Sequence, residues 1–250
     1  MGAKHFTERL ATPTFRLGTW SCGHVHREPG AEQAADQPTI NVVTSGMYVR
    51  HAGRRSVVAD PTVAVLSSPG ETWRASHPTG CGAAGVWVLL EPDAEPLRAL
   101  AFADRVRPLA AAAWLDWAEV ARTGDLELAL AVISEVVDHA APPEREPTFV
   151  RHARRILAAR LADPPGLEDL ALEVRASPWH LCRTFREVTG RTPRAYAEQL
   201  RLARAARQIE LGCDDLAGLA LALGFASHSH FTARFLRAFG RTPRALRART

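Results

Sequence analysis

Apolar and polar residues alternate with two different periods along this chain. Up to about Pro92 the pattern has the short period of β-strands, and the candidate strands are separated by Gly, Pro or Asp. These candidates are Phe15–Cys22, Thr39–His51, Ser56–Ala59, Thr62–Ser67 and Ala84–Leu90. Short strands at this spacing predict a small β-barrel or sandwich.

Beyond that point the period changes to the period of helices. Leu126, Leu130, Ile133 and Val137 recur at steps of four, three and four, which is typical of one helix face. The run from residue 141 to residue 148 contains three prolines and indicates a stiff linker. The predicted fold class is therefore α+β, with a β domain over 1–92, a helical segment over 93–141, a linker over 142–148 and an all-α domain over 149–250.

The last hundred residues contain a repeat. The segment from Thr184 to Ala195 recurs 50 residues later and ends both times in Gly-Arg-Thr-Pro-Arg-Ala. Ser177 and Ser227 are suited to cap the start of a helix, and Gly190 and Gly240 are suited to end it. A shorter helix precedes each of these across a turn of three or four residues, with one extra residue in the second turn. This layout predicts two helix-turn-helix units, and the second helix of each unit lies near 178–189 or 227–239.

Charge separates the two halves of the chain. Residues 1–150 carry 13 basic and 18 acidic side chains, whereas residues 151–250 carry 18 basic and 9 acidic ones. All 18 basic residues of the second half are arginine, whose planar fork of donors matches phosphate oxygens and the edge of guanine. A genome rich in G·C explains arginine in place of lysine, but it does not explain the concentration of charge in one half. Double-stranded DNA is the predicted partner.

Two long segments carry a family resemblance. From Leu167 the chain reads Leu-Glu-Asp-Leu-Ala, then Ser-Pro-Trp-His-Leu-Cys-Arg-Thr-Phe-Arg and Gly-Arg-Thr-Pro; from Leu223 it reads Leu-Gly-Phe-Ala-x-His-Ser-His-Phe and then Phe-Gly-Arg-Thr-Pro. Over about residues 149–249 these segments resemble the double helix-turn-helix domain of AraC/XylS-family transcription regulators. Ala59-Asp-Pro-Thr-Val-Ala and Ser68-Pro-Gly-Glu resemble the cupin-like sensor half of such regulators.

The resemblance implies that the second helix of each unit enters the major groove, and that the long helix Pro193–Leu211 sets the two about one DNA turn apart. The implied DNA-binding residues are Trp179, Cys182, Arg183, Arg186, His228, Ser229, Thr232 and Arg237. Arg183 is the predicted reader of guanine and Arg186 a predicted phosphate contact. The family commonly has arginine at the position of Ala233, so we expect weaker base readout from the second unit.

The amino-terminal half contains two sets of candidate ligands. Cys22, His24 and His26 alternate along one strand and its turn, and His77 and Cys81 follow downstream, so zinc or another transition metal is a candidate cofactor. Surface histidines with buried cysteines are the alternative interpretation. Trp20, Trp73 and Trp87 are candidate walls for a small organic effector, and ordinary core residues otherwise.

The remaining patterns restrict the class of protein. Four scattered cysteines and no secretory leader predict a cytoplasmic protein with reduced thiols, and no segment is apolar enough to span a bilayer. No phosphate loop or nucleophile elbow is present, so no enzymatic activity is expected. The alternative is a cupin-like metalloenzyme, or a thiol or metal sensor, with a DNA-binding tail. RNA polymerase is a further candidate partner. The Leu126–Val137 stripe favours a homodimer, and the alternative is that it packs on its own barrel.

Overall fold

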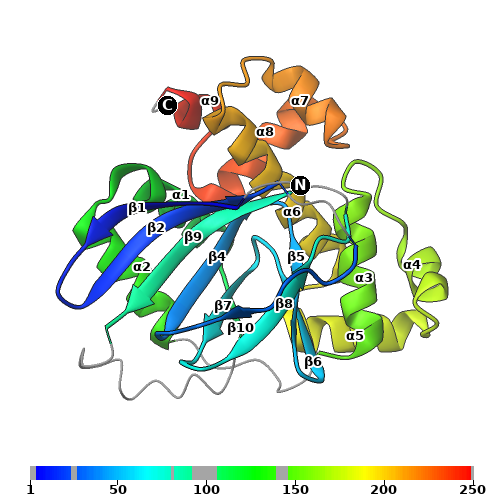
Figure 1. Cartoon of the computed structure of the whole chain (residues 1–250). Helices are drawn as coiled ribbons and strands as arrows, with labels where there is room; N and C mark the ends of the chain where they lie inside the picture. The colour runs from blue at the N-terminus through cyan, green and yellow to red at the C-terminus, as the bar shows by residue number, and fades with distance from the viewer. Residues whose placement is uncertain (1–3, 24–26, 80–81, 92–105, 139–145, 249–250) are drawn as a thin grey trace. The chain divides into compact units, whose positions relative to one another are not determined.

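The computed structural model describes residues 4–23, 27–79, 82–91, 106–138 and 146–248, and the chain divides into two compact units (Figure 1). The β unit comprises Met1–Leu109 and Asp116–Glu146, and the helical unit comprises Ala110–Leu115 and Pro147–Thr250. Most of the described part of the predicted helical segment 93–141 therefore belongs to the β unit. The predicted linker 142–148 lies mainly outside the described residues.

The β unit contains two antiparallel sheets. The larger has the strand order β1 (Lys4–Ala11), β2 (Phe15–Cys22), β9 (Ala83–Leu90), β4 (Thr39–Ser45), β7 (Val63–Ser67) and β10 (Val106–Pro108). The smaller has the order β3 (Gln33–Ala34), β8 (Thr72–Ser76), β5 (Tyr48–Ala52) and β6 (Arg55–Ala59). Together with the helices that follow, these sheets confirm the predicted α+β fold class.

One face of the larger sheet packs against two helices, α1 (Ala111–Thr123) and α2 (Leu126–Asp138). Phe15 and Leu17 of β2 share this core with Trp117 of α1 and Ile133 of α2. Successive side chains of a strand point to opposite faces, so the alternate residues of β2, β4 and β9 face away from the helices. That second face lines a cavity between the two sheets, because residues of both sheets surround it.

One sequence prediction for this unit needs correction. The segment Thr39–His51 is not one strand, because it is interrupted at Gly46 and continues as β5 in the smaller sheet. Gly46 has a φ of 73°, and a Cβ there would lie 2.1 Å from the carbonyl oxygen of Gly82, so only glycine fits. The predicted stripe of α2 is divided between two environments: Leu126 and Leu130 are 46% and 50% exposed, whereas Ile133 is buried together with Ala129, Val132 and Val136.

The helical unit contains the predicted double helix-turn-helix. Its helices are α3 (Thr148–Ala159), α4 (Leu167–Glu173), α5 (Pro178–Thr189), α6 (Pro193–Glu210), α7 (Leu216–Ala222), α8 (His228–Phe239) and α9 (Pro243–Arg247). The pairs α4–α5 and α7–α8 form the first and the second helix-turn-helix unit, and the long α6 connects them. The turn has four residues in the first pair (174–177) and five in the second (223–227), so the second turn is longer by one residue as predicted, although each turn is one residue longer than the predicted three or four. No helix in the described part of the chain is long and apolar enough to cross a bilayer.

Capping begins and ends α5 and α8 at the predicted residues. The backbone N–H of His180 donates to Ser177 Oγ at 3.3 Å, and that of His230 donates to Ser227 Oγ at 3.1 Å. Each cap contributes about 1 kcal/mol to helix stability. Gly190 and Gly240 then end the helices in the left-handed conformation.

Candidate functional site

The exposed face of α5 carries the residues predicted to read DNA. Leu181 and Phe185 are buried in the first helix-turn-helix core, whereas Trp179, Arg183 and Arg186 are exposed on α5. Cys182 is half-buried and lines a groove shared with α4 and α6. The helical period therefore separates a core face from a face available to a partner.

Neighbours on the same helix hold the Arg183 guanidinium in place. Its Nε donates to Glu187 Oε1 at 2.9 Å, and its Cζ lies 5.3 Å from the centroid of the Trp179 ring. The side chains of Arg183 and Glu187 are 62% and 54% exposed, so their ion pair contributes only a few tenths of a kcal/mol. Arg183 can therefore exchange its ion pair with Glu187 for hydrogen bonds to a base edge at little cost in free energy. Glu187 was missed by the sequence analysis, although an acid four residues after an arginine on a helix is a recognisable signal.

The corresponding face of α8 is less basic. His228, Ser229 and Ala233 are exposed, but the hydroxyl oxygen of Thr232 is buried and has no hydrogen-bond partner among the described residues, contrary to the expected exposure. Arg234 forms two hydrogen bonds to Glu198 of α6, at 2.7 and 2.6 Å. Arg237, which the sequence resemblance predicts to contact DNA, is exposed on this face.

The long helix α6 also joins the second turn. Arg201 Nη1 donates to the backbone oxygen of Gly224 at 3.1 Å, and its guanidinium lies 5.1 Å from the Phe225 ring centroid. Burial lowers the pKa of Arg201, and the Glu198 carboxylate opposes that shift. Arg201 therefore has a structural role in the second helix-turn-helix that its spacing along α6 did not reveal.

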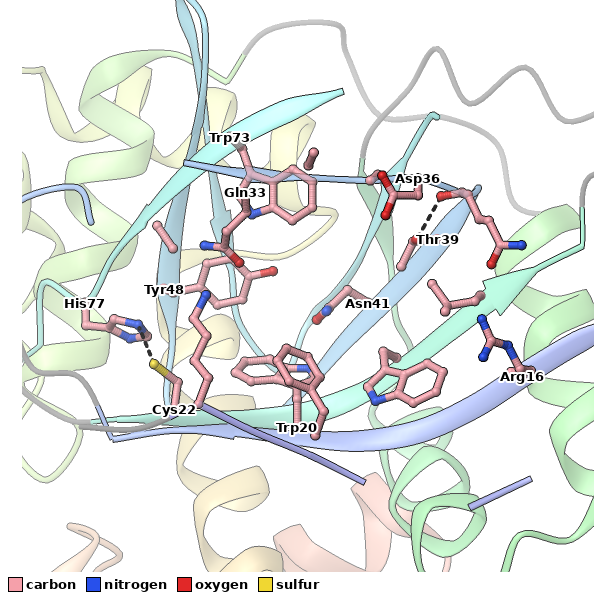
Figure 2. Close-up of a pocket in the computed structure, with 18 residues that line it drawn as sticks. Arg16, Trp20, Cys22, Gln33, Asp36, Thr39, Asn41, Tyr48, Trp73 and His77 are labelled. Carbon is pink, nitrogen blue, oxygen red and sulfur yellow. Dashed lines mark hydrogen bonds between the residues drawn. The ribbon is translucent and has the colours of Figure 1, made fainter. Parts of the chain in front are cut away.

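In the β unit, the three candidate effector tryptophans line one cavity of about 710 Å³ between the sheets (Figure 2). Trp20 lies on β2, Trp87 on β9 and Trp73 on β8. Trp73 and Trp20 lie on opposite sides of the cavity, and Asn41 points into it from β4. Three residues far apart in the sequence are thus brought to one site.

A reciprocal exchange of glycine and tryptophan forms one wall of the cavity. In the β2–β9 register Trp87 lies opposite Gly18, and Trp20 lies opposite Gly85. A Cβ at Gly18 would lie 2.4 Å from the Trp87 ring, and one at Gly85 would lie 2.8 Å from Trp20 Nε1. Each indole therefore packs directly against the backbone of the neighbouring strand. No other residue type leaves that space.

Buried charge supports the opposite wall. The Arg50 guanidinium lies 4.2 Å from the centroid of the Trp73 ring, its Nη2 lies 3.3 Å from Glu71 Oε1, and its Nη1 donates to the Leu66 oxygen. Glu71 belongs to the Ser68-Pro-Gly-Glu segment, and in the Ala59-Asp-Pro-Thr segment Asp60 accepts from the backbone N–H and hydroxyl of Thr62. The acids of the two cupin-like motifs thus stabilise the scaffold around the cavity.

A thiol and an imidazole meet at one end of the cavity. Cys22 Sγ lies 3.5 Å from His77 Nε2, and the two residues are only 4% and 3% exposed (Figure 2). Lys4 is paired with Cys22 in the β1–β2 register; partial burial lowers the pKa of its ammonium, and the Cys22 thiol opposes that shift. Burial also raises the pKa of Tyr48, nearby in the lining, to about 12.

These contacts bring together two of the five candidate metal ligands. His24, His26 and Cys81 lie outside the described residues, and within the described part of the chain no group of three or more His, Cys, Asp or Glu residues is placed to hold a metal ion. Cys22 and His77 lie 55 residues apart, and spacing alone did not pair them. Zinc at this end of the β unit stays a prediction.

Known proteins are similar to the helical unit. Residues 170–249 match the model of a family described as a helix-turn-helix domain. Right origin-binding protein of Escherichia coli K12 is 34% identical over 87 residues, which is 35% of this chain and 30% of that protein. The transcriptional activator RhaS of Pectobacterium carotovorum is 37% identical over 67 residues, which is 27% of this chain and 24% of RhaS. The chain thus spans less than a third of the length of either relative.

Solved structures give a similar result. An AraC-type DNA-binding domain from Chromobacterium violaceum is 31% identical and aligns over 40% of this chain and 90% of that one, with a TM-score of 0.39. A fatty-acid-bound ToxT from Vibrio cholerae aligns over 95% of this chain and 96% of that one, at 13% identity and a TM-score of 0.40.

The helical unit therefore contains a domain of the helix-turn-helix class, matched over residues 170–249 and built from two helix-turn-helix units. Within that class the match over residues 170–249 confirms the AraC-type resemblance predicted from the sequence.

Proposed function

We propose that this chain is a sequence-specific transcription regulator that places α5 in the major groove of DNA. The observation that carries the proposal is the exposed face of α5, where Trp179, Arg183 and Arg186 lie opposite the buried Leu181 and Phe185. A helix fits the major groove, and an arginine can donate two hydrogen bonds to guanine O6 and N7. Such a pair contributes about 1–3 kcal/mol of discrimination against other bases.

Phosphate contacts supply the remaining affinity in this proposal. Residues 151–250 carry 18 arginines against 9 acidic residues, and the exposed Arg186 and Arg237 lie on the two groove-directed helices. Neutralising phosphates releases counterions, so binding weakens steeply as salt rises. Base readout through Arg183 then decides which sequence is preferred.

Selection of random duplexes by the purified full-length chain at two salt concentrations tests this proposal. We expect an enriched motif with a G·C preference that the Arg183→Ala variant loses. The matched control is Arg122→Ala, which removes an exposed arginine from α1 of the β unit and leaves the motif unchanged. No enriched motif with the wild-type chain, or a G·C preference that survives Arg183→Ala, would contradict the assignment.

The cavity of the β unit is the proposed effector site. Its volume of about 710 Å³ and the three tryptophans in its walls suit a small organic molecule. The expected result is that a bound effector quenches tryptophan fluorescence and changes DNA affinity, and that Trp73→Ala weakens both effects. An effector that changes DNA affinity equally in the wild type and in Trp73→Ala would place its site elsewhere.

A homodimer that contacts RNA polymerase is the proposed assembly. The exposed Leu126 and Leu130 lie one helical turn apart on α2 and are suited to meet a second copy of the same helix. Light scattering should then show a dimer. The double variant Leu126→Glu, Leu130→Glu should dissociate this dimer, whereas Glu127→Ala on the same helix should leave it intact. A monomeric wild type would remove the dimer from the proposal.

A further inference from the structure

The thiol and imidazole at the end of the cavity have no role in the function proposed above. Cys22 Sγ and His77 Nε2 are 3.5 Å apart, which is within hydrogen-bond range for sulfur. Both residues are buried from bulk solvent, yet both line the cavity. A molecule inside the cavity can therefore reach this thiol more easily than a reagent in bulk water can.

Two hydrogen-bond donors belong to residues that line the same cavity as the thiol. The Trp20 Nε1–H, on the same strand face two residues before Cys22, is buried and has no partner within the described residues. Lys4 lies directly across from Cys22 in the register. Both donors line the cavity, so they would favour a ligand oxygen that carries partial negative charge.

The walls and charges of the cavity restrict the shape and sign of the ligand. Indoles on opposite sides, Trp73 on one and Trp20 on the other, favour a flat molecule. The charged residues of the lining are the cations Lys4 and Arg16 and the single acid Asp36, so an aromatic cage for a cationic ligand is disfavoured. A planar compound with a carbonyl oxygen satisfies the walls and the donors together.

We propose that Cys22 is a covalent attachment site for planar α,β-unsaturated carbonyl compounds of the quinone class, with His77 as the proton acceptor. The proposal rests on the cavity being an effector site. It assigns that site a reactive ligand class, and it gives the Cys22–His77 contact a chemical role.

The addition balances without any further reagent. The Cys22 thiol transfers its proton to His77 Nε2, and the sulfur forms a bond to a ring carbon β to one carbonyl as the ring C=C bond breaks. The electron pair moves to that carbonyl oxygen, and the oxygen takes the proton from His77. The hydrogen of the attacked carbon moves to the second oxygen, so the product is a hydroquinone thioether.

The first experiment uses the full chain with Cys22 as its single cysteine, obtained with Cys81→Ser, Cys182→Ser and Cys213→Ser. The probe is 1,4-benzoquinone, with intact mass as the readout. We expect one adduct, formed at a rate that saturates with quinone concentration, because a noncovalent complex in the cavity precedes the reaction. Hydroquinone, the reduced and unreactive form kept free of oxygen, should slow the reaction by competition.

The matched control keeps Cys182 as the single cysteine, through Cys22→Ser, Cys81→Ser and Cys213→Ser. Cys182 is half-exposed on α5 and does not belong to the cavity lining, so its rate should rise linearly with quinone concentration and should not change with hydroquinone. Three results would each overturn the proposal. Cys22 does not react, or it reacts no faster than in the same chain unfolded in urea, or bound zinc blocks the adduct.

The role of His77 is tested separately from ligand binding. In the Cys22-only chain, His77→Gln should slow adduct formation about 100-fold and leave the hydroquinone affinity, measured by tryptophan fluorescence, unchanged. An unchanged adduct rate would remove His77 from the proposal. If hydroquinone binds but no adduct forms with the quinone, the covalent step alone is refuted. If hydroquinone does not bind and no adduct forms, the effector site is refuted as well.

Discussion

The two helix-turn-helix units share a scaffold but present different surfaces. Residues 181–190 and 231–240 have the same order of buried, half-buried and exposed positions. At the exposed positions, Arg183 of the first unit corresponds to Ala233 of the second, and Arg186 corresponds to Leu236. A repeated core thus carries two unlike faces, because packing constrains the buried positions and leaves the exposed ones free to change.

Local tertiary contacts increase this difference. Arg234, near the centre of α8, is held by Glu198 of α6, whereas Arg183 pairs with the exposed Glu187 on its own helix. The first unit therefore offers an arginine that can exchange partners at low cost. The second unit uses its arginine to fix α8 against α6.

The largest expected effect concerns the turns that precede α5 and α8. Gly224 (φ 76°) corresponds to Arg175 (φ 56°), but a Cβ at Gly224 would lie 1.7 Å from the backbone oxygen of Ala162. Gly224→Ala should destabilise the helical unit by about 3 kcal/mol, because it combines left-handed strain with a backbone clash. Urea unfolding measures this loss; the control, Arg175→Ala, should change stability by less than about 0.5 kcal/mol. A similar effect of both variants would mean that the two turns are equivalent.

The next effect separates the two groove-directed helices. Arg183→Ala should weaken binding to the preferred duplex about 10- to 100-fold, which corresponds to the 1–3 kcal/mol of one bidentate base contact. Ser229→Ala on α8 should change it only a few-fold. Competition titrations at fixed salt measure both affinities. Equal losses in the two variants would contradict the expected asymmetry of base readout.

A smaller effect is expected from a substitution that makes the first turn more like the second. Arg175 has a positive φ, which is unfavourable for a residue with a side chain. Arg175→Gly should therefore stabilise the helical unit by about 1 kcal/mol, measured by thermal or urea unfolding. Arg160→Gly, placed where the backbone has a negative φ of −115°, should give no such gain. A destabilised Arg175→Gly variant would show that contacts of the arginine side chain outweigh the backbone strain.

The smallest effect concerns the ion pair that fixes α8. Glu198→Gln should lower stability by about 0.5 kcal/mol, because the pair with Arg234 is partly exposed. The released arginine should increase nonspecific DNA affinity a few-fold at low salt and steepen the log–log salt dependence by about one unit. Glu173→Gln, which releases Arg160 after α3, is the control. No change in salt dependence would indicate that Arg234 does not reach DNA even when it is released.

Much of the helical unit could be predicted because its signals are local. Ser177, Gly190, Ser227 and Gly240 act on the backbone beside them, and the apolar period fixes which side of each helix is buried. In the β unit, the single predicted strand Thr39–His51 was wrong because the break at Gly46 depends on the close approach of Gly82, 36 positions away. The apolar pattern continues across the break and conceals it.

By itself, the sequence determined the α+β class, the two helix-turn-helix units and the faces of their second helices, because residues close in the chain decide capping, helical period and charge. The tertiary structure decided which distant groups meet. It paired Cys22 with His77, placed Trp20, Trp73 and Trp87 around one cavity, and turned Arg234 toward Glu198. Strand register and helix packing fix these contacts, and neither depends on spacing along the chain.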